Sequence, residues 1–148
     1  MAATPRIGAS KVLESREADD GMTIRRRRVS PDGHRFTTYE RIELPQLIVL
    51  KRSGNREVFD RDKLTVSVRR SVGKFLGSEL AIETVVNEVE KRLRQQGEDV
   101  INYQQIGNTV LDVLAERNEV AYVRYASVFL DFKTLGDFER ILRERKQK

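Results

Sequence analysis

Two adjacent cations, Lys51 and Arg52, follow a short apolar run at residues 47–50 and precede a Ser-Gly-Asn turn. The branched residues of the run favour a buried strand, and a second short strand through Arg56 and Val58 could pair back on it as a hairpin. Lysine and arginine supply charge, while turn and helix amides supply directed N–H donors. The stretch could therefore hold a ligand that carries phosphate. The alternative, which periodicity alone favours, is a surface hairpin with solvated cations.

A second cationic group is the run of four arginines at residues 25–28. In an extended strand these side chains alternate between the two faces, so at least one pair must be exposed. An exposed pair could contact the phosphate backbone of DNA. It could equally form a solvated strand edge that discourages aggregation. The residues alone do not favour either interpretation.

Composition bounds the remaining chemistry. The 148 residues are 39% hydrophobic and 34% charged, with a net charge of +5 that permits a polyanionic partner. The absence of cysteine excludes disulfides and thiolate metal sites, and the single histidine, His34, excludes a His-rich metal centre and reads as a turn residue. No apolar run approaches the roughly 20 residues of a membrane span, and the first residues lack a signal peptide's apolar core. We therefore expect a cytoplasmic protein without a membrane partner.

Catalysis has little support in the sequence. There is no GxxxxGK[ST] phosphate loop, no cysteine nucleophile and no HExxH. A single histidine in a turn is a weak general base. We expect a protein that is not an enzyme.

The elements that must position these residues form an α+β fold. Residues 11–15, 22–29 and 35–42 read as short strands separated by turn formers at 19–21 and 30–33, a small sheet that would be marginal alone. After the hairpin, Asp60 can cap a helix. Apolar residues at helical spacing then predict a bundle, with helices over residues 61–75, 79–95, from an Asn102–Gln105 capping box onward, 120–132 and 135–145.

Several of these stretches resemble known sequences. VLKRSGNREVFDRDKL is similar to the opening signature of the ATP-cone, a regulatory nucleotide-binding domain of ribonucleotide reductases and of their repressor, the NrdR family. Earlier in the chain, the order and spacing of the NrdR zinc ribbon are matched by LESR, DG, IRRRR and GHRFTTYER. Later in the chain, AYVRYASVFLDF resembles the end of the NrdR cone. The resemblance covers residues 11 to about 140. It implies a degenerate zinc-ribbon-like unit at 1–44, an ATP-cone at 47–137, and a helix end with a basic tail at 138–148.

The zinc-binding knuckles of that family are missing. ATPRIG, at residues 3–8, stands where the first CPxCG should be, and SPDG, at residues 30–33, replaces the second. The resemblance implies zinc, but its ligands are absent, and zinc supplies much of a small ribbon's folding free energy. The unit could fold by packing on the rest of the protein, stay partly disordered without a partner, or have lost its cysteines by design or recoding.

The resemblance also implies site residues. For the nucleotide it places Lys51 and Arg52 on phosphates, with Lys63 a third cation, and implies ATP and dATP as effectors with Mg²⁺ on the phosphates. Simple core packing explains Phe59 as well as a ligand contact does. The whole expected nucleotide site is Val49, Lys51, Arg52, Gly54, Glu57, Phe59 and Lys63.

For DNA, arginines would contact the backbone and hydroxyls would donate to phosphates or base edges. The expected residues are Arg16, Arg25, Arg26, Arg27, Arg28, Arg35, Thr37, Thr38, Tyr39 and Arg41. Further along, we expect Tyr122, Arg124, Tyr125 and Phe129 to serve the core or a self-association surface, although Tyr122 could reach a nucleotide.

By resemblance, we expect a transcriptional repressor of ribonucleotide reductase genes. Its cone would sense ATP and dATP, and the occupied state would set a homo-oligomer that can or cannot bind double-stranded operator DNA, because a nucleotide changes DNA affinity only if it prefers one state. The alternative is a nucleotide-sensing protein-interaction module that has lost DNA binding with its zinc. An enzyme such as a nucleotidase ranks last.

Overall fold

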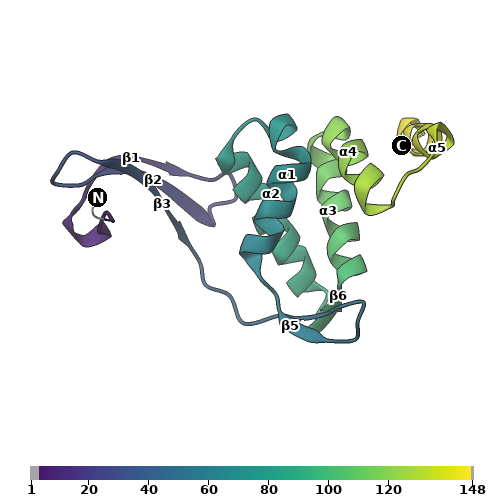
Figure 1. Ribbon diagram of the computed structural model, residues 1–148, viewed down its shortest axis with the longest axis horizontal. Helices are drawn as coiled ribbons and strands as arrows, with labels where there is room; N and C mark the ends of the chain where they lie inside the picture. The colour runs from purple at the N-terminus through teal and green to yellow at the C-terminus, as the bar shows by residue number, and fades with distance from the viewer. Residues whose placement is uncertain (1–3, 148) are drawn as a thin grey trace. The chain divides into compact units, whose positions relative to one another are not determined.

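The computed structural model describes residues 4–147, so Ala3, at the start of the first knuckle position, lies outside the described residues. The chain divides into two compact units at the boundary between Leu44 and Pro45. Each unit has its own small sheet, and the second also holds the α-helices (Figure 1). The expected α+β class is confirmed.

The first unit is an antiparallel sheet of order β1-β2-β3. Its strands are β1 (Lys11–Glu17), β2 (Thr23–Val29) and β3 (Arg35–Arg41), and a 3-10 turn, η1 (Ile7–Ala9), precedes them. They match the expected strands closely. Both connecting turns contain a glycine with positive φ, Gly21 at 70° and Gly33 at 91°, a conformation that residues with a Cβ rarely adopt.

The second unit opens with a sheet of order β5-β4-β6. Strands β4 (Ile48–Leu50) and β5 (Arg56–Val58) form the expected hairpin. Strand β6 (Val100–Asn102) pairs with β4 in parallel and was not predicted, because three residues are too few to show a periodicity. β4 is thus the central strand.

The helices begin and end at recognisable caps. They are α1 (Arg61–Leu76), α2 (Glu79–Gln95), α3 (Tyr103–Arg117), α4 (Glu119–Phe129) and α5 (Leu135–Lys146). The Asp60 side chain caps α1, and the expected Asn102–Gln105 capping box opens α3. α4 ends at Phe129 and not at the expected residue 132. A Schellman-type end stops it, in which Asp131 adopts φ 54° and the Phe132 amide donates to the Ser127 carbonyl.

The core of the second unit lies among α1 to α4 and the sheet. Its fully buried side chains come from the predicted faces of the helices, and include Val68, Val86, Val89, Leu93, Val110, Val113 and Leu114. None of the described helices is both long enough and apolar enough to span a bilayer.

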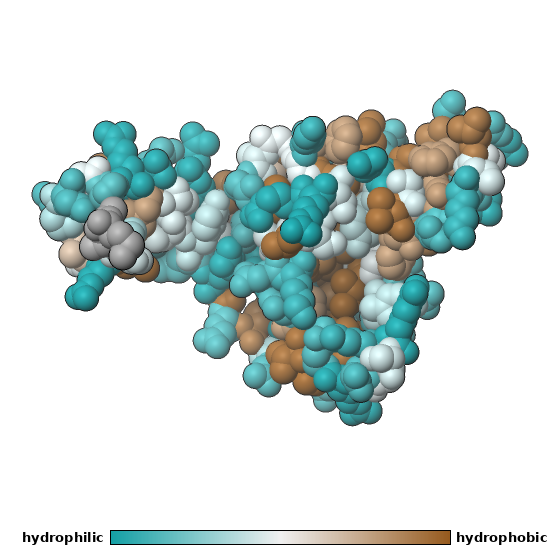
Figure 2. Space-filling view, viewed as in Figure 1, coloured by the Kyte–Doolittle hydropathy of each residue, from teal (hydrophilic) through white to brown (hydrophobic). Residues whose placement is uncertain are grey.

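Helix α5 differs from this pattern. Of its apolar residues only Ile141 is buried, while Leu135 is 80% exposed, Leu142 is 46% exposed and Phe138 is 36% exposed. Hydrophobic residues accordingly appear on the surface over α5 in Figure 2. Few elements are packed against this helix, so its apolar side is only partly covered.

Candidate functional site

The tip of the β4–β5 hairpin is a tight turn that presents cations. The Lys51 amide donates to the Asn55 carbonyl at 2.9 Å, and the Gly54 amide donates to the Lys51 carbonyl at 3.0 Å. Gly54 has φ 86°, so the turn requires a residue that tolerates the left-handed region. The turn therefore fixes the backbone positions of Lys51 and Arg52 directly after β4, the central strand.

Glu57 lies between two of the expected phosphate-binding cations. Its carboxylate is 2.9 Å from the Lys51 Nζ and 3.4 Å from the Lys63 Nζ. The hydrogen bond from Lys51, aided by that from Lys63, lowers the pKa of the Glu57 carboxyl below its usual value. The structure thus brings Lys51, Glu57 and Lys63 together around one negative charge, and a phosphate group could occupy the same cationic position.

Arg52 points to a residue that sequence reasoning missed. Its guanidinium lies 4.8 Å from the centroid of the Tyr103 ring, a cation–π distance. Tyr103 is the first residue of α3 and follows β6 directly. Because Leu50 pairs with Asn102 in the parallel register, the carboxyl ends of β4 and β6 meet at one edge of the sheet. An aromatic side chain directly after a capping Asn was the available signal.

The apolar residues of the expected site lie deeper. Val49 is buried in the core, opposite Glu57 in the strand register. Phe59 is partly buried and packs against the core, and its amide donates to the Leu47 carbonyl. These contacts account for both residues as structural, and they leave part of the Phe59 side chain accessible beside the α1 N-terminus.

Arg61, at the start of α1, is a further residue that was not predicted. Its guanidinium donates to Glu83 at 2.8 Å and to Glu90 at 2.9 Å, and also bonds Asn87. Glu83, Asn87 and Glu90 are buried on α2. Their spacing of four and three residues places a polar stripe on one helix face, which was the signal that could have revealed the network. Arg61 thereby fixes the beginning of α1, next to Lys63.

In the first unit, the strand register sorts the expected DNA-binding residues onto two faces. Arg25 is opposite Tyr39 and Arg27 is opposite Thr37, whereas Arg26 is opposite Thr38. Neighbouring residues of a strand point to opposite faces. One face therefore combines Arg16, Arg25, Arg27, Arg35, Thr37, Tyr39 and Arg41, and the other combines Arg26, Arg28 and Thr38.

Several of these side chains contact one another. Arg27 donates to the Thr37 hydroxyl at 2.9 Å, Arg28 donates to the Thr38 hydroxyl at 3.0 Å, and the Arg41 guanidinium lies 5.3 Å from the Tyr39 ring centroid. Arg26 pairs with Glu40 at 3.4 Å, and Arg16 pairs with Glu14 at 2.9 Å. The threonine hydroxyls and the arginine guanidinium groups thus fix one another's orientation across the sheet.

Comparison with known families assigns both units. The ATP cone domain model matches residues 47–135, and the model for the N-terminal domain of transcriptional repressor NrdR-like proteins matches residues 7–40. The transcriptional repressor NrdR of Streptococcus sanguinis is 46% identical over 143 residues, covering 95% of this chain and 91% of the relative. This chain belongs to the NrdR family.

Other NrdR proteins show the same degree of similarity. The transcriptional repressor NrdR of Streptococcus gordonii is 47% identical over 143 residues, again covering 95% of this chain and 91% of the relative. That of Streptococcus suis is 46% identical over 136 residues, covering 91% and 83%. These relatives are all named transcriptional repressors, which are regulators. Their names confirm the expectation that the family is not one of enzymes.

The match to the NrdR-like N-terminal domain implies a bound zinc ion, but the residues of this chain cannot form its site. Structural zinc sites take four ligands, almost always cysteine or histidine. The chain has no cysteine and one histidine, and the described residues contain no group of three or more His, Asp or Glu that could hold a metal. Serine occurs at or near both knuckle positions: Ser30 begins the second, at residues 30–33, and Ser10 follows the first, at residues 3–8, by two residues.

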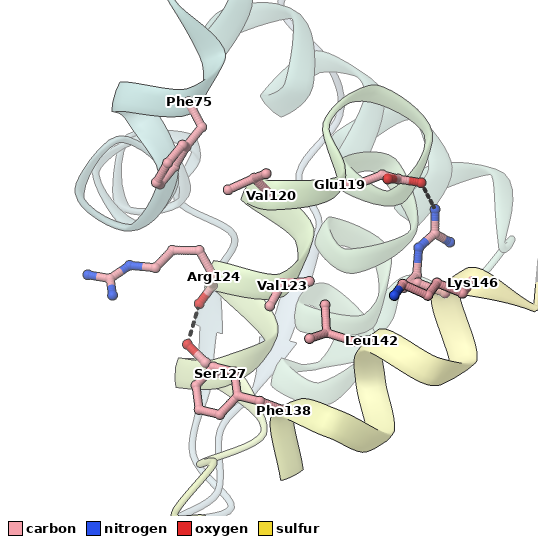
Figure 3. Close-up of a pocket in the computed structure, with 10 residues that line it drawn as sticks. Phe75, Glu119, Val120, Val123, Arg124, Ser127, Phe138, Leu142 and Lys146 are labelled. Carbon is pink, nitrogen blue, oxygen red and sulfur yellow. Dashed lines mark hydrogen bonds and ion pairs between the residues drawn. The ribbon is translucent and has the colours of Figure 1, made fainter. Parts of the chain in front are cut away.

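The expected core or self-association residues lie between α4 and its neighbours. Tyr125 is buried, stacks with Phe129 at 6.0 Å between centroids, and has its pKa raised by burial. Tyr122 lies under the Arg145 guanidinium of α5 at 5.0 Å. Arg124 lines an apolar groove of about 490 Å³ between the two helices, in which Val123 and Leu142 point toward each other (Figure 3).

Proposed function

We propose that this chain is a nucleotide-responsive transcriptional repressor that binds operator DNA of ribonucleotide reductase genes in the bacterial cytoplasm. Membership of the NrdR family and the ATP-cone match support the regulatory role. The observation that carries the nucleotide part is the Lys51–Glu57–Lys63 cluster beside Arg52 and Tyr103. Cations and a helix N-terminus meet there, as an anionic ligand requires.

In this proposal ATP or dATP binds with its phosphates on Lys51, Arg52 and Lys63. The phosphates displace the Glu57 carboxylate from its cations, and Gly54 keeps the turn open to them. Mg²⁺ accompanies the phosphates, because it commonly binds through substrate phosphates and few protein ligands. Val49 and Phe59 form the apolar wall of the site.

The DNA contact in this proposal comes from the sheet of the first unit. Arginines recognise phosphates with their planar, charged donors, and hydroxyls add shorter-range contacts. The face that combines Arg25, Arg27, Tyr39 and Arg41 carries the larger share of the expected residues, so we place the phosphate backbone there.

Nucleotide occupancy is read out through self-association in this proposal. The α4–α5 groove is apolar inside, with exposed Val120, Phe138 and Leu142. Its rim carries three cations, Arg124, Arg145 and Lys146, and one carboxylate, Glu119, which lies 3.7 Å from Arg145. A second copy of the chain, related by two-fold symmetry, would cover the apolar residues of both grooves at once, so we assign the groove to a second copy.

An operator-shift assay tests the function. The protein is assayed with dATP, with ATP and without nucleotide, each at two salt concentrations. A nucleotide-dependent shift with sequence preference and steep salt dependence supports the proposal. A nucleotide-dependent mass change without a DNA shift would instead favour a protein-interaction module, and phosphate release would indicate an enzyme.

A further inference from the structure

The first unit is tied together by hydrogen bonds next to the first knuckle position, at residues 3–8, and within the second, at residues 30–33. Ser10 stands between η1 and β1, and Ser30 stands directly after β2. Both side chains are hydroxyls, which are poor ligands for zinc compared with thiolate or imidazole. Their contacts show what holds these ends of the chain.

At the first position, one guanidinium group joins three segments. Arg28 Nη1 donates to the Ser10 hydroxyl at 3.1 Å, and Arg28 Nε donates to the Thr38 hydroxyl at 3.0 Å. Arg28 itself lies on the middle strand. The Ser10 hydroxyl donates onward to the Ile7 carbonyl at 2.6 Å. One side chain thus connects the segment before β1 to β2 and β3.

At the second position, a serine closes the turn between β2 and β3. The Ser30 hydroxyl lies within hydrogen-bond distance of the Asp32 carboxylate and of the His34 carbonyl. The Ser30 amide donates to the His34 carbonyl at 2.8 Å, and the Gly33 amide donates to the Ser30 carbonyl at 2.9 Å. The hydrogen bond from Ser30 also lowers the pKa of Asp32, so the carboxylate stays charged. The turn is therefore closed by hydrogen bonds between its own residues.

We propose that the N-terminal unit of this chain is a metal-free ribbon, in which the Arg28 clamp and the Ser30 turn replace zinc as the cross-links. A structural metal normally supplies a ribbon's folding free energy, and chelators unfold such units. Here the same strand ends are fixed by a guanidinium fork and by hydroxyls. The fork matters as well as the charge, because it spans two acceptors with a fixed geometry, one in the segment before β1 and one on β3.

The proposal assigns Arg28 a structural role. Its Nε and Nη1 donors are used by Ser10 and Thr38, so it acts as a positioning residue for the sheet. We assign the DNA contacts to the opposite face of the sheet, where Arg25 and Arg27 lie. The structural role of Arg28 follows from the contacts within the unit alone, whereas the DNA-contacting face rests on the proposed function.

The metal content and the order of the unit test the first half of the proposal. The full chain is expressed with zinc in the medium, its zinc content is measured by elemental analysis, and amide hydrogen exchange is followed with and without a chelator. We expect far less than one zinc per chain, and slow exchange of the β1 to β3 amides that the chelator leaves unchanged. Stoichiometric zinc, protection lost on chelation, or strand amides without protection would each overturn the proposal.

Variants test the clamp. Arg28→Gln removes the two hydrogen bonds of the fork, and it should speed exchange of the amides near Ser10 and Thr38 by at least about tenfold. Arg28→Lys, which keeps the charge but not the fork, should behave similarly. Arg25→Gln, on the same strand but the other face, is the matched control and should leave those amides unchanged. Exchange in Arg28→Lys as slow as in the parent chain would refute the clamp, as would equal effects of the Arg28 and Arg25 variants.

If Arg28→Gln unfolds the unit entirely, the milder Ser10→Ala variant decides. It removes one acceptor of the fork and leaves Thr38 in place. We expect faster exchange confined to the segment before β1 and the first residues of that strand. Unchanged exchange there would contradict the assignment of Ser10.

Discussion

The carboxylate of Glu57 lies 2.9 Å from the ammonium group of Lys51, across the hairpin that joins β4 to β5. The two residues belong to the proposed nucleotide site. A triphosphate must compete with Glu57 for the same cation, so occupancy by the nucleotide changes the contacts of the hairpin. This exchange of one anion for another gives the effector a direct mechanical connection to β4, the central strand of the small sheet.

Lys51→Ala should weaken ATP and dATP binding by about tenfold, because it removes a charge-assisted hydrogen bond to phosphate. Isothermal titration calorimetry measures the affinity, and analytical ultracentrifugation should show a matching change in nucleotide-dependent assembly. Lys74→Ala, an exposed lysine in the last turn of α1, is the control and should bind normally. Equal affinities for the parent chain and Lys51→Ala would remove the phosphate assignment.

Tyr103→Leu should reduce nucleotide affinity roughly threefold, since the ring no longer holds the Arg52 guanidinium through a cation–π contact. Tyr103→Phe keeps the aromatic face and should bind like the parent chain. Calorimetry on the two variants compares ring with hydroxyl. A loss of affinity in the Phe variant as large as in the Leu variant would show that the hydroxyl, and not the ring, is what matters.

Arg27→Ala should weaken operator binding for all sequences and lower the slope of log affinity against log salt by about one, as expected for the loss of one phosphate contact. The combined replacement of Arg25 and Arg27 by Ala, both on the face assigned to DNA, should abolish the operator shift. Nucleotide affinity of both variants should stay normal, since the second unit is untouched. An undiminished shift in the combined variant would defeat the DNA assignment of the strand.

Arg61→Met should lower the free energy of unfolding by roughly 3 kcal/mol, because the buried Glu83 and Glu90 would lose the guanidinium charge that joins them to α1. Arg69→Met is the matched control, since Arg69 also joins α1 to α2 but pairs with the exposed Glu79 and should cost under about 1 kcal/mol. Urea unfolding gives both values. Similar losses in the two variants would mean that the Arg61 network is not specially stabilising.

Leu142→Asp should prevent nucleotide-dependent self-association, because the α4–α5 groove would receive a charge where the second copy packs. Val66→Asp places the same charge at an exposed apolar position of α1 that does not line the groove, and it should assemble normally. Light scattering with and without dATP compares them. Assembly of Leu142→Asp at the parent level would rule out this surface.

Much of the fold could be predicted from the sequence because its signals are local. Ser78 and Gly97 bound α2, whose limits agree with the expectation, and the Asn102–Gln105 capping box forms as its spacing indicates. The hairpin follows from a short apolar run and a glycine turn. These features depend on residues within a few positions of each other.

The remainder depends on contacts between distant segments. The pairing of β6 with β4 joins residues fifty positions apart, and it is what brings Tyr103 to Arg52. The sequence could suggest the polar stripe of α2, but not that Arg61 would be its partner. The exposure of Leu135 and Leu142 shows the limit of periodicity, because an apolar stripe marks a surface to be covered without saying whether the same chain covers it.

The cross-links through Ser10, just after the first knuckle position, and Ser30, within the second, have a consequence for life under oxidative stress. Regulators that depend on metal thiolates lose the metal when peroxide converts a cysteine to sulfenic acid or a disulfide. This ribbon offers peroxide no thiol to attack, since the whole chain is free of cysteine and the Ser10–Arg28–Thr38 contacts have no redox chemistry. The hydrogen bonds that hold the strand ends should therefore persist in conditions that inactivate thiol-dependent repressors.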